Sequence, residues 1–259
     1  MARPVAVVTG ASSGIGEVFA RRLAADQDLL LIARRRDRLE SLASELTAQT
    51  GARVEVLEAD LAGEQGLTIA AERIGAERNL DLLVNNAGFG LSGYFWETDR
   101  DRQEEMHRLH VMAVMRLCHV ALRTMVARNT GGIINVASVA AFVHAPGSAS
   151  YGATKAWVTH FTEGLYLDLK AAGSAVKVQA LCPGFTYSEF HDVLRRDRTK
   201  LAPKSWWLDP NFVVEESLRG LQRGQLFVVL DWKYKTLVNM VSRLPVGLRV
   251  WGEGKRNRK

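Results

Sequence analysis

The sequence is poor in cysteine and lacks any long uncharged apolar run. Only two of its 259 residues are cysteines, Cys118 and Cys182, which excludes a disulfide scaffold and is typical of a reducing compartment. No uncharged apolar run approaches the roughly 18 residues of a membrane span, and no signal-peptide pattern precedes Val5. We therefore expect a soluble, cytoplasmic protein.

Repeats, low-complexity segments and Pro/Gly/Ser linkers are also absent. The histidines form no cluster with acids or thiols at the spacing of metal ligands, so no metal site is expected. An apolar fraction of 47% and a charged fraction of 24% exclude a disordered chain. Together these features favour one globular domain over residues 1–259.

Acidic residues are nearly missing from the end of the chain. The net charge is +6, but residues 232–259 hold eight basic residues and one acid, which leaves 26 basic against 27 acidic residues before them. Because the body has no basic bias, nucleic acid is not an expected partner. Apolar residues recur at helical spacing at Leu237, Val241, Leu244, Leu248 and Trp251, although Pro245 should kink or split any such helix. This basic C-terminal tail either contacts an anionic membrane surface weakly or packs on its own domain or a sister subunit.

What the sequence does contain is an alternation of short β-branched runs with helical stretches. The expected strands are Val5–Val8, Leu29–Ala33, Val54–Leu57, Leu82–Val84, Ile133–Val136, Val176–Leu181 and Leu226–Val229. The expected helices are Ile15–Ala25, Asp37–Thr50, Glu64–Glu77, Asp99–Arg128, Tyr151–Ala171 and Glu215–Gln222. This order predicts an α/β fold, a doubly wound parallel sheet of about seven strands with helices on both faces.

Residues 185–210 interrupt this alternation with a polar, charged stretch that follows an expected strand. Insertions of this size after the carboxyl end of a strand are usually functional. We expect a lid over a substrate site, and the alternative is a surface elaboration or a subunit contact.

A glycine-rich turn follows the first strand and opens the first helix. Gly10 permits a tight turn, while Gly14 and Gly16 allow a pyrophosphate to approach the backbone and the helix to pack close to the sheet. The start of the helix then offers free N–H groups to phosphates. We expect nucleotide binding by six residues of this turn: Gly10, Ser12, Ser13, Gly14, Ile15 and Gly16.

The end of the second strand indicates which dinucleotide is bound. A fold that prefers NAD usually has an acid there for the ribose 2′-OH, but this chain has Ala33 followed by three arginines. Guanidinium suits a phosphate, so the sequence favours NADP(H), with Arg34 as the expected contact. The alternative is that these arginines are a solvated helix start. Asp60, after the third strand, is placed to meet the adenine amino group or simply caps that strand.

A tyrosine and a lysine share one helix face. Tyr151 and Lys155 are at positions i and i+4. A nearby ammonium, helped by the cationic nicotinamide ring of the oxidised coenzyme, favours phenolate and lowers the pKa of the phenol. Ordinary surface packing is the alternative for such a pair. Ser138, which follows the fifth strand, adds a hydroxyl that can hydrogen-bond a substrate oxygen. The three residues together indicate a site that reduces carbonyl groups.

These motifs resemble those of the short-chain dehydrogenase/reductases, in the single-domain branch with a Rossmann-type sheet. The matching elements, in register over nearly the whole chain, are Thr9–Gly16, Asn85–Gly88, Ser138, Tyr151 with Lys155, and Pro183-Gly184. The resemblance implies that Tyr151 is the acid/base, that Ser138 orients the carbonyl, and that Lys155 tunes Tyr151 and holds the nicotinamide ribose. It further implies coenzyme contacts from Leu61, from Asn86, Ala87 and Gly88, and from Pro183, Gly184, Thr186 and Ser188.

One position departs from the family pattern. His110 stands where the family usually has an asparagine that anchors a water in a proton relay to the lysine. Because imidazole can also anchor a water and titrates near neutrality, we expect His110 to take part in catalysis through an altered relay. The alternative is impaired catalysis, which would make the chain a non-catalytic NADP(H)-binding regulatory protein.

The residues expected around the substrate are mostly apolar: Phe89, Leu91, Tyr94, Phe95, Trp96, Phe142, Val143, Phe185, Tyr187 and Phe190. Such a pocket suits a hydrophobic ketone or its alcohol, unless these aromatics pack the lid or an interface. The sequence thus predicts an NADP(H)-dependent oxidoreductase that moves hydride between nicotinamide and a carbonyl or secondary alcohol. The resemblance also implies a homodimer or homotetramer formed through the helices near Asp99–Arg128 and Tyr151–Ala171.

Overall fold

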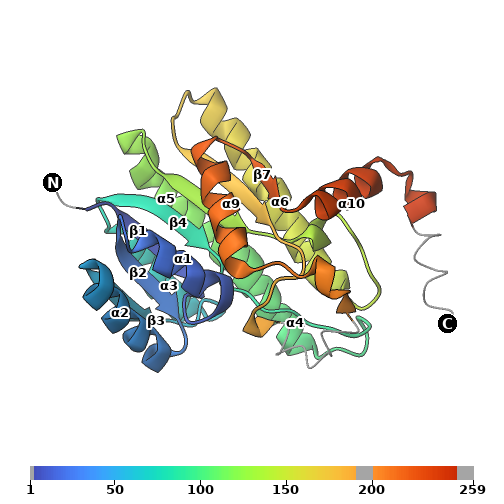
Figure 1. Cartoon of the computed structure of the whole chain (residues 1–259), viewed down its shortest axis with the longest axis horizontal. Helices are drawn as coiled ribbons and strands as arrows, with labels where there is room; N and C mark the ends of the chain where they lie inside the picture. The colour runs from blue at the N-terminus through green and yellow to red at the C-terminus, as the bar shows by residue number, and fades with distance from the viewer. Residues whose placement is uncertain (1–2, 191–200, 250–259) are drawn as a thin grey trace.

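The computed structural model describes residues 3–190 and 201–249. Its centre is one parallel sheet of seven strands in the order β3-β2-β1-β4-β5-β6-β7 (Figure 1). The strands are β1 Val5–Thr9, β2 Asp28–Ala33, β3 Val54–Glu58, β4 Leu80–Asn85, β5 Gly132–Val136, β6 Lys177–Cys182 and β7 Phe227–Val229. The order reverses direction beside β1, as in a doubly wound sheet, so the expected fold class is confirmed.

Both faces of the sheet are apolar and covered. In β2, Leu29 and Leu31 belong to one buried cluster, while Leu30 and Ile32 belong to the other, as the alternation of side chains along a strand requires. The first cluster takes apolar residues from α1 Gly14–Leu23, α2 Arg36–Thr50 and α9 Pro210–Gln222. The second takes them from α3 Glu64–Gly75, α5 Val114–Arg128 and α6 Ala149–Ala171. The core therefore lies in two layers on either side of the sheet.

The long helix expected over Asp99–Arg128 is divided. It consists of α4 Arg100–His107, the π-helical segment η1 Arg108–Ala113 and α5. By length and composition this stretch is apolar enough to cross a membrane, but Leu117 and Ala121 of α5 are buried in the layer beneath the sheet. The apolar residues of α5 that face the sheet are thus explained by packing in the core, whereas Met115 and Val126 are exposed. The π-helical turn places His110 in the interior, where it is 1% exposed.

A helix near the end of the described chain packs on the domain through the first part of its length. Helix α10 spans Trp232–Arg243 and stops before Pro245, as the ring of that proline requires. Tyr234 and Val238 are the buried residues of α10, and Tyr234 joins the first apolar cluster. Of the expected lid, residues 191–200 lie outside the described part of the chain, as do residues 250–259 of the expected tail.

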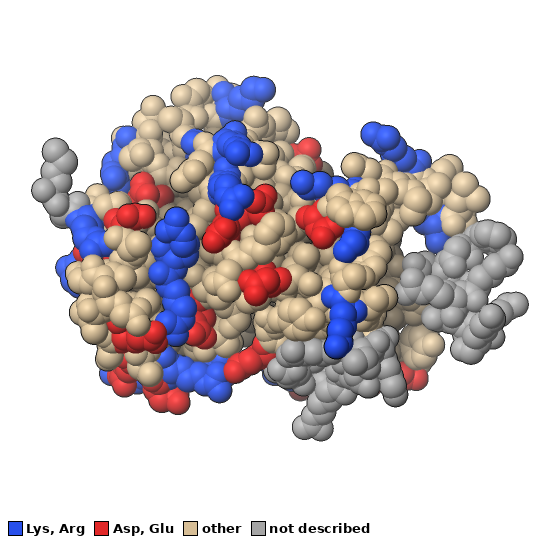
Figure 2. All heavy atoms as spheres, in the orientation of Figure 1, with Lys and Arg blue, Asp and Glu red and all other residues tan. Residues whose placement is uncertain are grey.

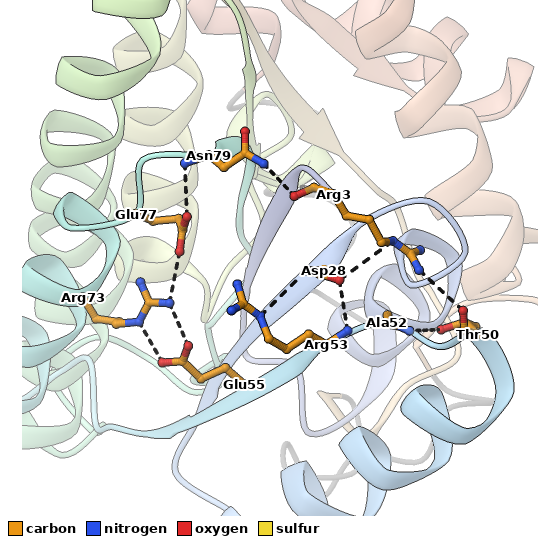
Figure 3. Close-up of polar contacts among 9 residues, drawn as sticks. All are labelled: Arg3, Asp28, Thr50, Ala52, Arg53, Glu55, Arg73, Glu77 and Asn79. Atoms are coloured by element: carbon orange, nitrogen blue, oxygen red, sulfur yellow. Dashed lines mark hydrogen bonds and ion pairs between the residues drawn. The ribbon is translucent and has the colours of Figure 1, made fainter. Parts of the chain in front are cut away.

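Ion pairs fasten the edge of the sheet where the strands begin (Figure 3). Asp28 at the start of β2 lies 3.8 Å from both Arg3 and Arg53, and its carboxylate accepts the Arg53 N–H at 3.0 Å. Asn79, just before β4, donates to the Arg3 carbonyl at 2.6 Å. These contacts hold the amino ends of β1, β2 and β4 together and leave the carboxyl ends to form the site.

Charges of both signs are interspersed over the body of the molecule on the face seen in Figure 2. No broad basic surface is visible there, in line with the nearly neutral charge of residues 1–231.

Candidate active site at the carboxyl edge of the sheet

The glycine-rich turn connects the end of β1 to α1. Gly10 has a φ of +66°, a conformation that favours glycine, and a Cβ on Gly16 would lie 2.4 Å from the Gly10 carbonyl oxygen. The side chain of Ser13, the residue before α1, makes no capping hydrogen bond. The first N–H groups of α1 therefore face the carboxyl edge without competition from a capping side chain, which suits a phosphate.

Asn86 supports this turn from the end of β4. Its side-chain amide donates to the carbonyl oxygens of Thr9 and Gly10 at 2.9 and 3.3 Å. The Thr9 hydroxyl in turn accepts the N–H groups of Asn86 and Ala87 at 2.9 and 3.0 Å. The structure thus shows Asn86 and Ala87 bracing the turn, and Gly88 lies next to them against the ring of His110.

The arginines after β2 diverge. Arg34 is 62% exposed and lies 3.4 Å from Glu105 of α4. Arg35 instead turns back to the glycine-rich turn, where it donates to the hydroxyl groups of Ser12 and Ser13 at 3.0 and 2.8 Å. The guanidinium that sits at the turn is therefore that of Arg35.

Asp60 and Leu61 follow β3 on the same edge. The Asp60 carboxylate is exposed and accepts the Ala62 N–H at 3.1 Å, which is the geometry of a turn cap. Leu61 is 4% exposed and packs in the second apolar cluster, so only its backbone is available to a ligand.

Ser138, Tyr151 and Lys155 come together between β5 and α6. The Ser138 hydroxyl influences the pKa of the Tyr151 phenol. The Ser138 Oγ accepts the Ala140 N–H at 3.1 Å and donates to the Pro183 carbonyl at 3.5 Å. The Lys155 Nζ lies 5.8 Å from the centre of the Tyr151 ring and donates to the Val136 carbonyl at 2.9 Å. A hydroxyl, a phenol and an amine thus lie at the carboxyl edge of the sheet, where the glycine-rich turn also lies.

Burial determines how the phenol and the amine titrate. It raises the pKa of Tyr151 to about 12, and the Ser138 hydroxyl opposes this shift. It lowers the pKa of Lys155 to about 8. The sequence-based expectation that the ammonium lowers the pKa of the phenol is therefore wrong for the protein alone, because loss of hydration disfavours both charged forms.

His110 joins the loop after β4 to helix α6. Its Nε2 accepts the Phe89 N–H at 3.2 Å, and its Nδ1–H donates to the Thr154 hydroxyl at 2.9 Å. The Thr154 hydroxyl donates in turn to the Tyr151 carbonyl at 2.9 Å. These partners fix the neutral tautomer of the ring.

Two expectations for His110 need correction. Both ring nitrogens already have protein partners, so the ring does not offer one to a relay water. Burial, together with the nearby charge of Lys155, holds the pKa of His110 well below 6.5, so the ring does not titrate near neutrality. What the ring does is fix the position of the first turn of α6.

The loop after β6 closes the site from the other side. A Cβ on Gly184 would lie 2.0 Å from the Tyr234 ring, whose hydroxyl accepts the Phe185 N–H at 2.9 Å. Thr186 is 3% exposed and donates to the Gly184 carbonyl at 3.1 Å. A Cβ on Gly14 would lie 3.1 Å from that of Ser188, so the loop reaches the glycine-rich turn.

Only some of the aromatic residues expected around the substrate lie at the site. Phe185 and Tyr187 pack on Trp207, with ring centres 5.5 and 5.1 Å apart, and Phe142 packs on Phe227. These three therefore follow the packing alternative. Nearer the phenol, the ring centre of Phe190 lies 5.8 Å from that of Tyr151.

A small hollow opens beside the phenol. It is lined by Leu91, Gly93, Phe95, Thr98, Gln103 and Gly147–Tyr151. Tyr94, Phe95 and Trp96 are 47%, 60% and 78% exposed next to it. Within residues 3–190 and 201–249, no group of three or more His, Cys, Asp or Glu side chains is arranged to hold a metal.

Comparison with known proteins identifies the family. The short chain dehydrogenase family matches residues 4–199. The chain belongs to the short-chain dehydrogenase family of oxidoreductases. A very-long-chain 3-oxoacyl-CoA reductase of Anas platyrhynchos is 32% identical over 78% of this chain, which spans 65% of the length of the duck protein.

Two solved structures of the family are similar over nearly the whole chain. A short-chain dehydrogenase of Sphingobium yanoikuyae in complex with NADPH is 32% identical, with a TM-score of 0.83 and coverage of 94% of this chain and 97% of the other. An alcohol dehydrogenase of Comamonas testosteroni specific for bulky-bulky ketones is 30% identical, with a TM-score of 0.79 and coverage of 95% and 96%.

Sequence reasoning overlooked several residues of this family member's site. The residues expected from the sequence include Arg34 but not Arg35, and they do not include Thr154. Tyr234 was assigned to the tail, although it supports the loop after β6. For Arg35 the sequence holds a signal, because it belongs to the run of three arginines after the second strand. For Tyr234 there was none, since its partners are distant in sequence.

Proposed function

We propose that the chain is an NADP(H)-dependent oxidoreductase that transfers hydride between nicotinamide and a carbonyl or secondary alcohol, with Tyr151 as the acid/base. The observation that carries this proposal is the placement of Ser138, Tyr151 and Lys155 at the same edge of the sheet as the glycine-rich turn. All three groups lie at the carboxyl edge of a doubly wound sheet, where such folds bind their ligands.

The residues fit a dinucleotide. The turn has no room for a Cβ at Gly16, and the start of α1 lacks a side-chain cap. The first N–H groups of α1 would hold the pyrophosphate, Lys155 the nicotinamide ribose, and the backbone from Pro183 to Thr186 the carboxamide, with Ser188 beside it. Asp60 and the Leu61 backbone would meet the adenine.

The arginines after β2 support NADP(H) over NAD(H). Neither Ala33 nor its neighbours offer an acid to a ribose 2′-OH, whereas Arg35 donates from the glycine-rich turn itself. Arg34 is exposed and free to swing from Glu105 toward the same phosphate. The Sphingobium relative, 32% identical, is a complex with NADPH.

The protein contributes orientation and a proton. Bound NADPH supplies the hydride. The Ser138 hydroxyl donates to the carbonyl oxygen of the substrate and orients it. Because the pKa of Tyr151 is raised to about 12, its Oη holds a proton at neutral pH and donates it to that oxygen as negative charge develops. Lys155, with a pKa of about 8, carries a positive charge at pH 7 and stabilises the phenolate that remains.

The substrate is proposed to be a bulky hydrophobic ketone or its alcohol. Support comes from the exposed aromatics Tyr94, Phe95 and Trp96 beside the hollow at Tyr151. The Comamonas relative is specific for bulky-bulky ketones, and the duck relative is a 3-oxoacyl-CoA reductase.

A homo-oligomer is proposed on the face of α5 and α6. An apolar groove there is lined by Met115, Cys118, His119, Leu122, Arg123, Val126, Phe161 and Leu165. Apolar side chains gathered on a surface of this kind mark an interface between subunits.

A coenzyme oxidation screen tests the function. NADPH and NADH are compared with ketones graded from acetone to bulky aryl and long-chain ketones. We expect NADPH oxidation to be at least about tenfold faster than NADH oxidation, because Arg35 would bind the 2′-phosphate. We also expect the rate of NADPH oxidation to increase with the size of the ketone, as the proposed substrate class requires. Oxidation of NADH alone contradicts the assignment of NADP(H) as the coenzyme. Coenzyme binding without turnover of any ketone contradicts the proposal that the protein is a carbonyl reductase.

A further inference from the structure

Glu189 places a carboxylate between two arginines of the coenzyme side. Its Oε2 accepts from Arg35 Nη1 at 2.9 Å and its Oε1 accepts from Arg38 Nη1 at 2.6 Å. Each oxygen thus has its own guanidinium. Glu189 is 154 residues from Arg35 in sequence and comes from the loop after β6.

The two arginines lie where a 2′-phosphate is read in this type of fold. Arg35 is the residue that precedes α2, and Arg38 is in its first turn. The Arg35 guanidinium also donates to the hydroxyl groups of Ser12 and Ser13 on the glycine-rich turn. Arginines at the end of the second strand accommodate the extra phosphate of NADP. The Glu189 carboxylate is therefore an anion that the chain itself supplies to the phosphate-binding groups.

The neighbours of Glu189 fix its place over the site. Ser188 lies against the glycine-rich turn at Gly14, and the Phe190 ring lies 5.8 Å from that of Tyr151. The loop therefore crosses from the phosphate side to the phenol with Glu189 between them. Its carboxylate is held close to the arginines by the chain on both sides.

Glu189 stays ionised in these two ion pairs, but a stronger anion can replace its carboxylate. Hydrogen bonds from Arg38 and Arg35 lower the pKa of Glu189 to about 2, so the carboxylate remains ionised at every working pH. The exposed fraction of the side chain is 40% for Arg35, 48% for Arg38 and 45% for Glu189. Water screens such pairs, and a phosphate dianion with three oxygens forms stronger bonds to guanidinium than a carboxylate does.

We propose that Glu189 determines coenzyme specificity by competing with the 2′-phosphate of NADP(H) for Arg35 and Arg38. This inference rests on the proposed coenzyme. NADP(H) must displace the carboxylate, whereas a coenzyme with a free 2′-OH leaves both ion pairs in place. The glutamate therefore weakens the binding of NADP(H) but not that of NAD(H). It reduces the difference between the affinities for the two coenzymes.

The test measures binding by titration calorimetry of the full chain with two probes that differ by one group. Adenosine 2′,5′-bisphosphate carries the 2′-phosphate, and 5′-AMP lacks it. Glu189→Gln should tighten the bisphosphate by about 3- to 10-fold and change 5′-AMP by less than about twofold, because only the first probe competes with the carboxylate. Circular dichroism and thermal unfolding verify that the variant is folded.

Glu40→Gln is the matched control. Glu40 pairs with Arg36 on the same helix at 2.6 Å, so the substitution removes the same charge close by without freeing Arg35 or Arg38. It should leave the ratio of the two probes unchanged. A Glu189→Gln protein that binds the bisphosphate no more tightly than wild type overturns the proposal, and so does one that gains equally for both probes.

The outcomes separate this inference from the proposed function. If wild type prefers the bisphosphate and Glu189→Gln leaves that preference unchanged, the role of Glu189 alone is refuted. If neither protein distinguishes the two probes, the NADP(H) assignment is refuted with it.

Discussion

The side chains at the end of β5 and on α6 titrate as burial dictates. The pKa of Tyr151 is raised to about 12 and that of Lys155 is lowered to about 8. The spacing of Tyr151 and Lys155 predicted that they share a helix face, but spacing says nothing about hydration. The spacing therefore placed the two residues on one helix face, but for the protein without coenzyme it gave the wrong direction for the pKa of the phenol.

The low pKa of Lys155 makes stability depend on pH. Between pH 8 and 10.5 the unfolded chain binds a proton that the folded chain has lost, so the free energy of unfolding rises with pH in this window. Relative to Lys155→Met, we expect wild type to gain up to about 3 kcal/mol across it. Urea unfolding of both proteins measures the difference. The exposed Lys170 of the same helix provides the control variant, Lys170→Met, for removal of a lysine. A difference between wild type and Lys155→Met that does not change with pH contradicts the account.

The two hydrogen bonds of His110 give a second prediction. His110→Ala leaves the partly buried Phe89 N–H without its acceptor and should lower the free energy of unfolding by about 1–3 kcal/mol. Below pH 6.5 the deficit should shrink, because the unfolded wild type binds a proton that the buried ring refuses. Denaturant titrations at pH 5.5 and 7.5 measure this. The exposed His160 supplies the control His160→Ala, and an equal cost for both variants would rule out the bracing role.

At the scale of helices and strands, the sequence predicted the positions of the strands and of most helices, but not which of them contact one another. Hydrophobic runs and turn residues are local signals, so β1 to β7 were placed to within a few residues. Helix α9 begins at Pro210, five residues before the expected Glu215, because Asp209 caps it by accepting the N–H groups of Asn211 and Phe212. The contact of α10 with the loop after β6 depends on chain folding and leaves no local trace.

The contact between Gly184 and Tyr234 couples these two elements. Gly184→Ala would place a Cβ 2.0 Å from the Tyr234 ring, so it should destabilise the protein by about 1–3 kcal/mol as overpacking does. In the double variant with Tyr234→Ala the cost should be smaller than the sum of the two, by at least about 1 kcal/mol. Urea unfolding of the cycle tests it. Gly164→Ala, in α6 with nothing within 4 Å, should be neutral or stabilising, and strict additivity of the first pair would contradict the coupling.

On the scale of the whole molecule, the family pattern and the doubly wound sheet followed from the sequence. The glycine-rich turn, Asn86, Ser138, Tyr151 and Lys155 are separated along the chain but follow strand ends, and parallel strands bring those ends to one edge. The ion pairs of Glu189 could not be inferred in this way. They join positions more than 150 residues apart, and no strand register fixes that distance.

The proposed subunit interface is tested on the apolar groove of α5 and α6. Val126 is 41% exposed at this groove, so Val126→Glu should place a charge in the interface and shift the protein toward monomer while preserving the fold. Sedimentation velocity gives the mass, and circular dichroism verifies folding. Glu163→Gln, an exposed position on α6, is the control. An oligomer that persists unchanged in Val126→Glu places the interface elsewhere.

The central claim is that Tyr151 passes the proton in carbonyl reduction. Tyr151→Phe keeps the ring and removes the hydroxyl, so single-turnover oxidation of saturating NADPH with the best ketone measures the proton step directly. We predict a rate at least about 100-fold below wild type, the scale of general acid catalysis, with the affinity for NADPH changed by less than threefold. A Tyr151→Phe protein that turns over at the wild-type rate would contradict the account.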